Sequence, residues 1–505
     1  MELELRQEYI SCWDNAYQTL MNQEETTEMI VPDACPDILQ ILDGEGKLLL
    51  QRKEAMDGKA ELSGCIKVGI LYQPEGENRV CSMEGILPFS TNLDSTAITR
   101  SSKLMVCPRI QKVDVHVLNP RKVLIKVNFT LDVTCYTPQT QSVSSCVEKR
   151  EQHGICEKVE EHQNHVVMAA QEKMFSYTDT LTLPAGNPDM EELLRFRTDC
   201  ISQDAKVIGN KLLFKGEARV ELMYRSRDGR PCTAIFPLPF SQMMEVGDVG
   251  EDSTPELRII FTNSSCKRAD EEGRSVSVEL ELMAQSVLSK THRVALLTDL
   301  YSTEYDMVDT RKMYTMSYLV DHGVAPESVR ELFECTMPVA RVLDVQLRPL
   351  QLANSKQGSE MTLNAEVEAY ILFETEEGDS SCLHRRMTVP HTIPISPQWD
   401  YRCDFCISRQ ASAMPASGGI EISFTVEFSW NAMEKRNVQG IERASLEEKP
   451  PITGEIPSVI IRSVRNGECL WDIAKSYRTT ENDIAEANAL PTAELYAGQM
   501  LLIPR

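Results

Sequence analysis

Two stretches in which hydrophobic and polar residues alternate recur along most of the chain. Alternation with a period of two, rich in β-branched and aromatic residues, is typical of β-strands. The first stretch of each pair is followed by a glycine in a polar segment, which predicts a hairpin turn; these glycines are Gly76, Gly229 and Gly378. The paired stretches are 64–72 with 123–136, 216–224 with 276–287, and 365–373 with 420–430.

A Pro-Asp segment shows that these pairs belong to a repeat. VPDACPDI at 31–38 matches LPAGNPDM at 183–190, at an offset of 152 residues, and Gly64 matches Gly216 at the same offset. A Pro-Phe pair follows in both copies, ending at Phe89 and Phe240. Pro36 and Asp37 suit the start of a helix, so one or two helical turns are expected over 36–42.

The third copy is more divergent. Ala365 takes the place of Gly216, 149 residues later, and Pro390-His391 takes the place of the Pro-Phe pair. Its start is ambiguous, because Pro338 fits the proline spacing whereas Val329, Leu332 and Phe333 fit the apolar spacing.

The chain changes character after Trp430. Residues 433–457 are charged, lack alternation and end in prolines, as in a linker. The tail then shows a short strand, two helical segments and a closing strand, with a capping-box start at Thr480 and Asp483.

We therefore predict a mainly β protein. Three repeated β-rich modules stand in tandem, followed by a linker and a small βααβ domain. The predicted bounds are 1–165, 166–311 and 312–432 for the modules, 433–457 for the linker and 458–505 for the last domain. Modules of about 150 residues are large enough to hold separate cores.

Charge and the N-terminus restrict the function classes. The net charge is −24, and no basic run interrupts it, so binding of nucleic acid or an anionic membrane is disfavoured. No stretch of 18 apolar residues predicts a membrane span. The first residues carry carboxylates and lack the basic and apolar regions of a secretory signal, so a cytoplasmic location is expected.

Sixteen cysteines are scattered, and only Cys403 and Cys406 form a CxxC pair. Without an export signal we expect free thiols. Two clusters contain zinc-ligand types, but neither has the spacing of a known finger, so buried cysteines and a solvated connector are favoured over metal. The clusters are Cys382, His384, His391, Cys403 and Cys406, and His153, Cys156, His162 and His165.

Catalytic motifs are absent from the sequence. It has no P-loop, G-x-G-x-x-G, H-E-x-x-H or G-x-S-x-G. Paired carboxylates such as Glu191-Glu192 are expected by chance in so acidic a chain. We predict a protein that is not an enzyme and needs no cofactor or metal.

The tail resembles a LysM domain. The matching segments are VRNGECLWDIA at 464–474 and YAGQMLLIP at 496–504, with Tyr477, Thr480, Ile484 and Asn488 between them. The resemblance implies a shallow groove that binds N-acetylglucosamine-containing glycans. Its residues would be Gly467, Glu468, Cys469 and Leu470 on one side, with Trp471 adjacent, and Leu495, Tyr496 and Ala497 on the other.

This groove departs from the family pattern at one turn, and its residues differ in their expected roles. The usual Gly-Asp-Thr or Gly-Asp-Ser turn is Gly467-Glu468-Cys469 here, so the hydroxyl that could cap the helix or contact a sugar is missing. Leu470 is expected in the small core, while the loop residues Glu468 and Tyr496 are the better interface candidates.

The repeats resemble the SPOCS domain of spore-forming Firmicutes. The Pro-Asp segments, the Gly64–Tyr72 strand with its copies and Leu297–Ser302 (LTDLYS) carry this resemblance. SPOCS repeats followed by one LysM domain form the layout of SipL-like spore-coat morphogenetic proteins.

That layout implies a scaffold in endospore formation. It would act in the mother-cell cytoplasm, at the outer forespore surface, and tether the coat basement layer. Its partner would be the coat basement-layer ATPase of stage IV sporulation, bound through the LysM domain, and other coat proteins could bind the repeats. The alternative is a peptidoglycan-binding envelope protein, which would require an export route.

Overall fold

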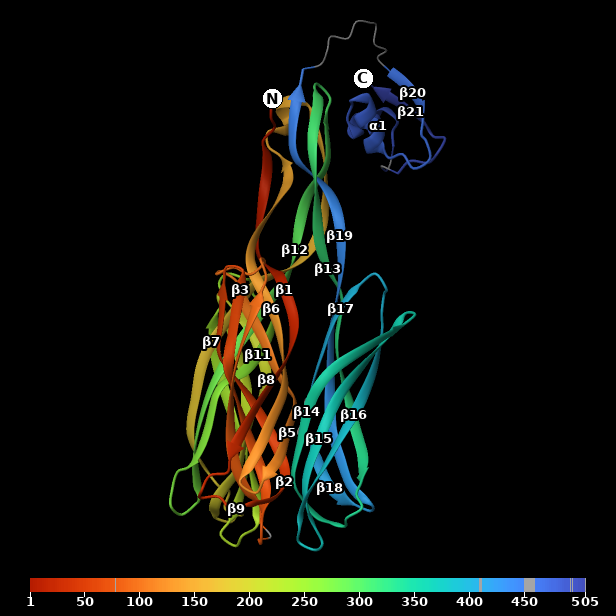
Figure 1. Ribbon diagram of the computed structural model, residues 1–505. Coiled ribbons are helices and arrows are strands. Elements are labelled where there is room, and N and C mark those ends of the chain that lie inside the picture. Colours follow the sequence, from red (N-terminus) through yellow and green to blue (C-terminus); the bar gives the residue numbers. More distant parts are fainter. Residues whose placement is uncertain (78, 408–410, 449–458, 491, 493, 505) are drawn as a thin grey trace.

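The computed structural model describes residues 1–77, 79–407, 411–448, 459–490, 492 and 494–504, which are mostly β-strand (Figure 1). The first unit contains β1 (Leu5–Ile30), β2 (Ile38–Met56), β3 (Lys59–Pro74), β4 (Cys81–Asp94), β5 (Lys103–Asn119) and β6 (Lys122–Val147), followed by a 3₁₀ turn at Arg150–His153. The second contains β7 (Ile155–Thr182), β8 (Met190–Ile208), β9 (Lys211–Ser226), β10 (Pro231–Glu245), β11 (Thr254–Arg268) and β12 (Ser275–Ser302). The third contains β13 (Asp306–Glu334), β14 (Val339–Gln357), β15 (Glu360–Thr375), β16 (Ser380–Pro394), β17 (Asp400–Ile407), β18 (Ser412–Ala416) and β19 (Gly419–Glu447). The tail contains β20 (Val459–Ser463), α1 (Leu470–Tyr477), α2 (Glu481–Ala487) and β21 (Met500–Pro504).

Each of the three units has the same pairing of strands. Its second, third and fourth strands form one antiparallel sheet, while its first strand pairs along its whole length with its last. Alternate side chains of the two layers meet in a hydrophobic core, as in a β-sandwich. The predicted mainly β fold, with strands and hairpin turns repeated three times, is confirmed. Gly76, Gly229 and Gly378 occupy these turns with positive φ.

The units close into a ring. β4 packs on β8, β10 on β14, and β16 on β2, so each unit contacts the next through equivalent strands. Beyond the sandwiches, the first and last strands of each unit continue into a common stem (Figure 1). The stem core is Leu3, Val147, Ile155, Leu297, Leu300, Ile441, Ala444 and Leu446.

The stem corrects the expected division of the chain. The boundary at 165/166 lies within β7 and that at 311/312 lies within β13. The expected linker at 433–457 is wrong up to residue 447, since these residues extend β19 and pair with β13. Its remainder, from 449, falls outside the described residues. The charged residues suggested a linker because one face of the paired strands in the stem is exposed to solvent.

The Pro-Asp segments form turns rather than the expected helix. Cys35 N donates to the Pro32 carbonyl, and β2 then begins at Ile38, which pairs with Pro74 of β3. Pairing with the neighbouring strand satisfies the backbone groups that a short helix would leave without partners. Arg121 fixes this turn by donating to the Cys35 and Val31 carbonyls at 2.6 and 3.0 Å.

The same arginine recurs in the second unit. Arg274 donates to the Asn187 and Leu183 carbonyls at 2.6 and 2.8 Å. In the third unit β14 begins at Val339, at the same offset of 149 residues from Met190, which resolves the ambiguous start in favour of Pro338.

A glycine in the middle of β3 and β9 permits a close approach of strands. A Cβ on Gly64 would lie 2.1 Å from the Leu49 carbonyl oxygen, and one on Gly216 would lie 2.5 Å from that of Ile201. Phe89 and Phe240 stand directly opposite these glycines and cover them.

The third unit has an alanine at the position of these glycines and a different strand register. Ala365 pairs with Leu352 beyond a register shift that sets two residues of β14 aside, which makes room for its methyl group. Opposite Ala365 stands Val389, so the expectation that His391 takes the place of the phenylalanines is wrong by two residues. His391 instead stacks on Phe428, with 5.3 Å between ring centroids.

Rings of charge join the three units at their centre. Equivalent positions of β2, β8 and β14 carry Asp43, Arg195 and Asp344, and Arg195 bonds both carboxylates, at 2.5 and 3.1 Å. Two residues further along, Arg197 bonds Glu45 through two nitrogens at 2.9 Å each. Arg197 also bonds Asp344 at 3.0 Å, so both arginines link all three units.

Candidate functional site

The LysM-like tail folds around a small core of its own. Thr480 caps α2 by accepting a hydrogen bond from Asp483 N at 3.0 Å, as the capping box predicted. The Asn488 amide donates to the Leu502 carbonyl at 2.6 Å and accepts from Leu502 N at 2.7 Å, which ties α2 to β21. Gly467 adopts a φ of 80° before α1, a conformation that favours glycine.

The proposed groove residues divide by exposure. Gly467, Cys469, Tyr496 and Ala497 are exposed, and Tyr496 keeps 71% of its surface in contact with solvent. Leu495 is half-buried and Leu470 is buried, as expected for a core residue. An exposed aromatic side chain on a loop is the type of residue that anchors binding partners.

Glu468 and Cys469 stabilise the turn before α1. Glu468 forms an ion pair with Arg462 and accepts a hydrogen bond from Arg465 N at 2.9 Å. The Cys469 thiol donates to Asp472 Oδ2 at 3.1 Å. Partial burial and this hydrogen bond raise the pKa of the Cys469 thiol, so the sulfur stays protonated and is a poor nucleophile.

One face of α1 docks on the tip of the stem. Asp299 of β12 accepts hydrogen bonds from Trp471 Nε1 at 2.8 Å and from Lys475 Nζ at 2.6 Å. Arg478, directly after α1, pairs with Asp306 of β13. Burial alone would raise the pKa of Asp299, but the bonds from Lys475 and Trp471 outweigh it and hold that pKa below its ordinary value.

Tyr301 completes this docking contact. Its ring lies 4.9 Å from that of Trp471 in an edge-to-face arrangement, and its hydroxyl donates to the Thr479 carbonyl at 2.8 Å. Tyr301 is itself part of the hydrophobic cluster of the LysM-like core. Trp471 is therefore only 7% exposed and contacts the stem.

Sequence reasoning did not find this docking contact. Asp299 and Tyr301 lie in the segment LTDLYS, which supported the resemblance of the repeats but was not interpreted as a contact with another part of the chain. The relevant signal was the unusual pair of an acid and an aromatic residue at the end of an amphipathic strand.

Within the described parts of the chain, the side chains of the cysteine and histidine clusters are not arranged as metal ligands. The sixteen cysteines form no disulfide among the residues that the structure describes, and these residues contain no group of three His, Cys, Asp or Glu side chains placed to bind a metal ion. His391 is 2.8 Å from Glu327, and His384 is 3.3 Å from Glu368. Each of these histidines thus has a carboxylate partner of its own.

Comparison with known families assigns two kinds of domain. The LysM domain model matches residues 463–504, and the model described as SipL, SPOCS domain matches residues 37–118 and 189–268. Both families are non-catalytic. Comparison with curated proteins and with solved structures found no match. Among the residues that the structure describes, no helix is long and apolar enough to cross a membrane.

Proposed function

We propose that this sporulation-related chain, with two SipL SPOCS domains and a LysM domain, is a non-enzymatic scaffold that tethers the spore-coat basement layer to the forespore surface. The LysM domain would bind the stage IV coat morphogenetic ATPase from the mother-cell cytoplasm. The three β-units would form a rigid body that holds this domain at the end of the stem.

The observation that carries the proposal is the division of the LysM surface into two faces. The α1 face is occupied by Asp299 and Tyr301 of the same chain. The loops with Gly467 and Tyr496 remain exposed and are fixed in orientation by the docking contact. A groove held in one orientation loses less conformational freedom when a partner binds.

Tyr496→Ala in the full chain tests the groove. Removing an exposed aromatic anchor from the centre of an interface costs about 2 kcal/mol or more, or roughly 30-fold in Kd. We therefore expect binding of the purified ATPase, measured by biolayer interferometry, to weaken by at least that factor. Tyr9→Ala is the matched control, because Tyr9 is 70% exposed but lies on the stem.

The outcomes separate two functions. Wild-type affinity of a folded Tyr496→Ala protein would refute the groove as the ATPase site. Retention of the full chain on insoluble peptidoglycan, lost in Tyr496→Ala, would favour the second candidate, a glycan-binding envelope protein. That candidate is supported by the LysM match itself, whereas Cys469 in place of a hydroxyl residue argues against it.

A further inference from the structure

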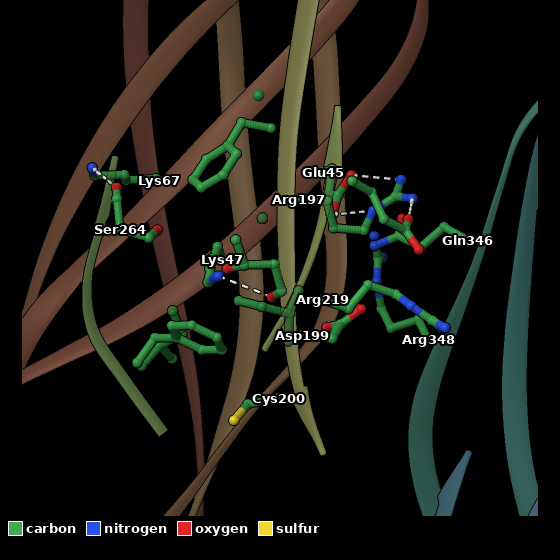
Figure 2. Close-up of a pocket in the computed structure, with 18 of the residues that line it drawn as sticks. Glu45, Lys47, Lys67, Arg197, Asp199, Cys200, Arg219, Ser264, Gln346 and Arg348 are labelled. Carbon is green, nitrogen blue, oxygen red and sulfur yellow. Dashed lines mark hydrogen bonds and ion pairs between the residues drawn. The ribbon is translucent and has the colours of Figure 1, made fainter. Parts of the chain in front are cut away.

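The ring of three units encloses a cavity of about 1050 Å³ where β2, β8 and β14 converge (Figure 2). All three units contribute to its lining. Its size is at the upper end of the range for small-molecule sites in proteins. Asp199 and Ile201 are exposed at its edge, so solvent reaches it there.

The lining of the cavity holds more basic than acidic residues, in a strongly acidic protein. Nine Lys or Arg residues and five Asp or Glu residues line it, which gives a formal lining charge of +4 in a chain of −24. Some of the cations are neutralised by neighbours. Arg195 and Arg197 bond the carboxylates of the charge rings, and Arg109 and Arg258 share Asp404, at 2.7 and 2.9 Å.

Four further cations line the same hollow: Lys47, Lys67, Arg219 and Arg348. Arg348 uses its Nη1 for a long ion pair with the buried Glu368, at 3.7 Å, and for a hydrogen bond to the Tyr370 hydroxyl at 3.2 Å. Arg348 is only 6% exposed, and its Nη2 has no hydrogen-bond partner among the described residues. The Nε of Arg219 is buried and equally unpartnered within the described chain. A buried donor left without an acceptor is costly, and a bound oxyanion would supply the acceptor.

In Figure 2, Lys67 lies at the left of the pocket, Lys47 near its middle and Arg348 at the right. Lys67 Nζ donates to the Ser264 carbonyl at 2.7 Å, and Lys47 Nζ donates to the Thr198 carbonyl at 2.9 Å. Each ammonium keeps further donors for a ligand. Cations on both sides of a hollow suit a ligand that carries more than one anionic group.

We propose that this central cavity binds a small molecule with two or more phosphate or carboxylate groups, held by Lys47, Lys67, Arg219 and Arg348. Guanidinium groups donate in a planar fork that matches both oxyanions, so the two ligand sources share one recognition chemistry. Because the cavity is built from all three units, the ligand joins them and stabilises the ring. This inference does not depend on the function of the LysM groove.

The environment of Lys47 supports the proposal and provides a specific readout. Burial lowers the pKa of Lys47 to about 7. Its charged and titratable neighbours are Glu45, Lys67, Asp199 and Cys200. An anion beside the amine favours the protonated form and raises its pKa. Binding at pH 8 is therefore expected to take up a proton.

Isothermal titration calorimetry of the full chain tests the site. Pyrophosphate and citrate are titrated at constant ionic strength and pH 8, in two buffers of different ionisation enthalpy. One site per chain is expected, with proton uptake on binding, and the tighter probe identifies phosphate or carboxylate as the preferred group. Arg348→Gln and Lys67→Gln should each raise Kd at least tenfold, whereas Arg230→Gln, on an exposed turn outside the cavity, should leave it unchanged.

Other outcomes overturn the proposal. Absence of saturable binding for both probes would show that the cavity is not an anion site. Binding of equal affinity in wild type, Arg348→Gln and Lys67→Gln would place the anion elsewhere. Lys67 is half-buried, and its hydrogen bond among the described residues goes to a carbonyl, so Lys67→Gln keeps the test valid if Arg348→Gln fails to fold. Circular dichroism of each variant establishes folding before titration.

Discussion

The docking of the LysM domain on the stem should depend on one carboxylate. Asp299 accepts hydrogen bonds from Trp471 and Lys475 of the LysM domain and from Arg311 of the stem, at 2.8, 2.6 and 2.9 Å. Asp299→Ala removes both carboxylate oxygens and with them all three hydrogen bonds. Trp471 and Lys475 then lose the hydrogen-bond acceptor that the stem gives them, while Trp471 keeps its ring contact with Tyr301 and the LysM domain keeps its own core.

The size of the effect follows from the geometry. A hydrogen bond to a charged group contributes about 1.5–3 kcal/mol, and the Trp471 bond is mostly buried. The Lys475 pair is discounted to about 1 kcal/mol, because the Lys475 side chain is 38% exposed. Together they give about 3 kcal/mol, so the ratio of undocked to docked molecules should rise roughly 100-fold.

Hydroxyl-radical footprinting with mass spectrometry measures this change. The Trp471 indole is 7% exposed when docked, so its oxidation should increase in Asp299→Ala while that of Trp430 in the third unit does not. Asp309→Ala is the matched control, since Asp309 also bonds Arg311 but does not contact the LysM domain. Equal oxidation of Trp471 in wild type and Asp299→Ala would refute the docking contact.

Three further predictions concern the ring of units. Arg197→Ala removes one ion-pair partner from each of three carboxylates, of which Glu45 and Asp344 keep Arg195, and should lower the free energy of unfolding by about 3–5 kcal/mol in denaturant titration; a loss under 1 kcal/mol would contradict its role. Burial alone would raise the pKa values of Glu45 and Asp344, but Arg195 and Arg197 outweigh this effect and lower both values. The stability that the two carboxylates contribute is therefore complete above about pH 4.5 and is lost as the pH falls through the lowered pKa values. Thermal unfolding between pH 6 and 3 should show this loss, which Arg197→Ala should reduce. Gly64→Ala sets a methyl group against the Leu49 carbonyl and should cost about 1–3 kcal/mol, whereas an unchanged melting temperature would show that the strands can separate there.

Most of the local structure could be predicted from the sequence, but little of how the strands and units assemble could be. Alternation located the strands, and the positive-φ requirement located Gly76 and its counterparts in the hairpin turns. Short-range patterns could not predict that the first and last strands of each unit pair over their full length, because those partners are far apart in sequence: in the first unit the separation runs from 92 residues (Ile30 and Lys122) to 142 (Leu5 and Val147). The charged end of β19 was therefore mistaken for a linker.

The candidate site was predictable to a similar degree. The LysM motif predicts the groove loops, which stay a prediction, and Tyr496 in one of these loops is exposed. The role of Trp471, in the core or in the groove, was ambiguous from the sequence. Its partners Asp299 and Tyr301 belong to the stem, which no sequence motif predicts. The Pro-Asp segment was wrongly expected to be helical, because the arginine that fixes its turn lies 86 residues away.

The charge rings explain why divergence between the repeats matters. In an assembly of three identical chains, equivalent positions around the axis would carry three like charges, which repel one another in a buried environment. A single chain with three non-identical copies can place Asp43 and Asp344 on either side of Arg195. It can likewise combine Glu45, Arg197 and Gln346 in the next ring. The second copy supplies both arginines and the third supplies the carboxylate of Asp344 that they share, so the difference between the second copy and the other two creates the pairing that joins the units.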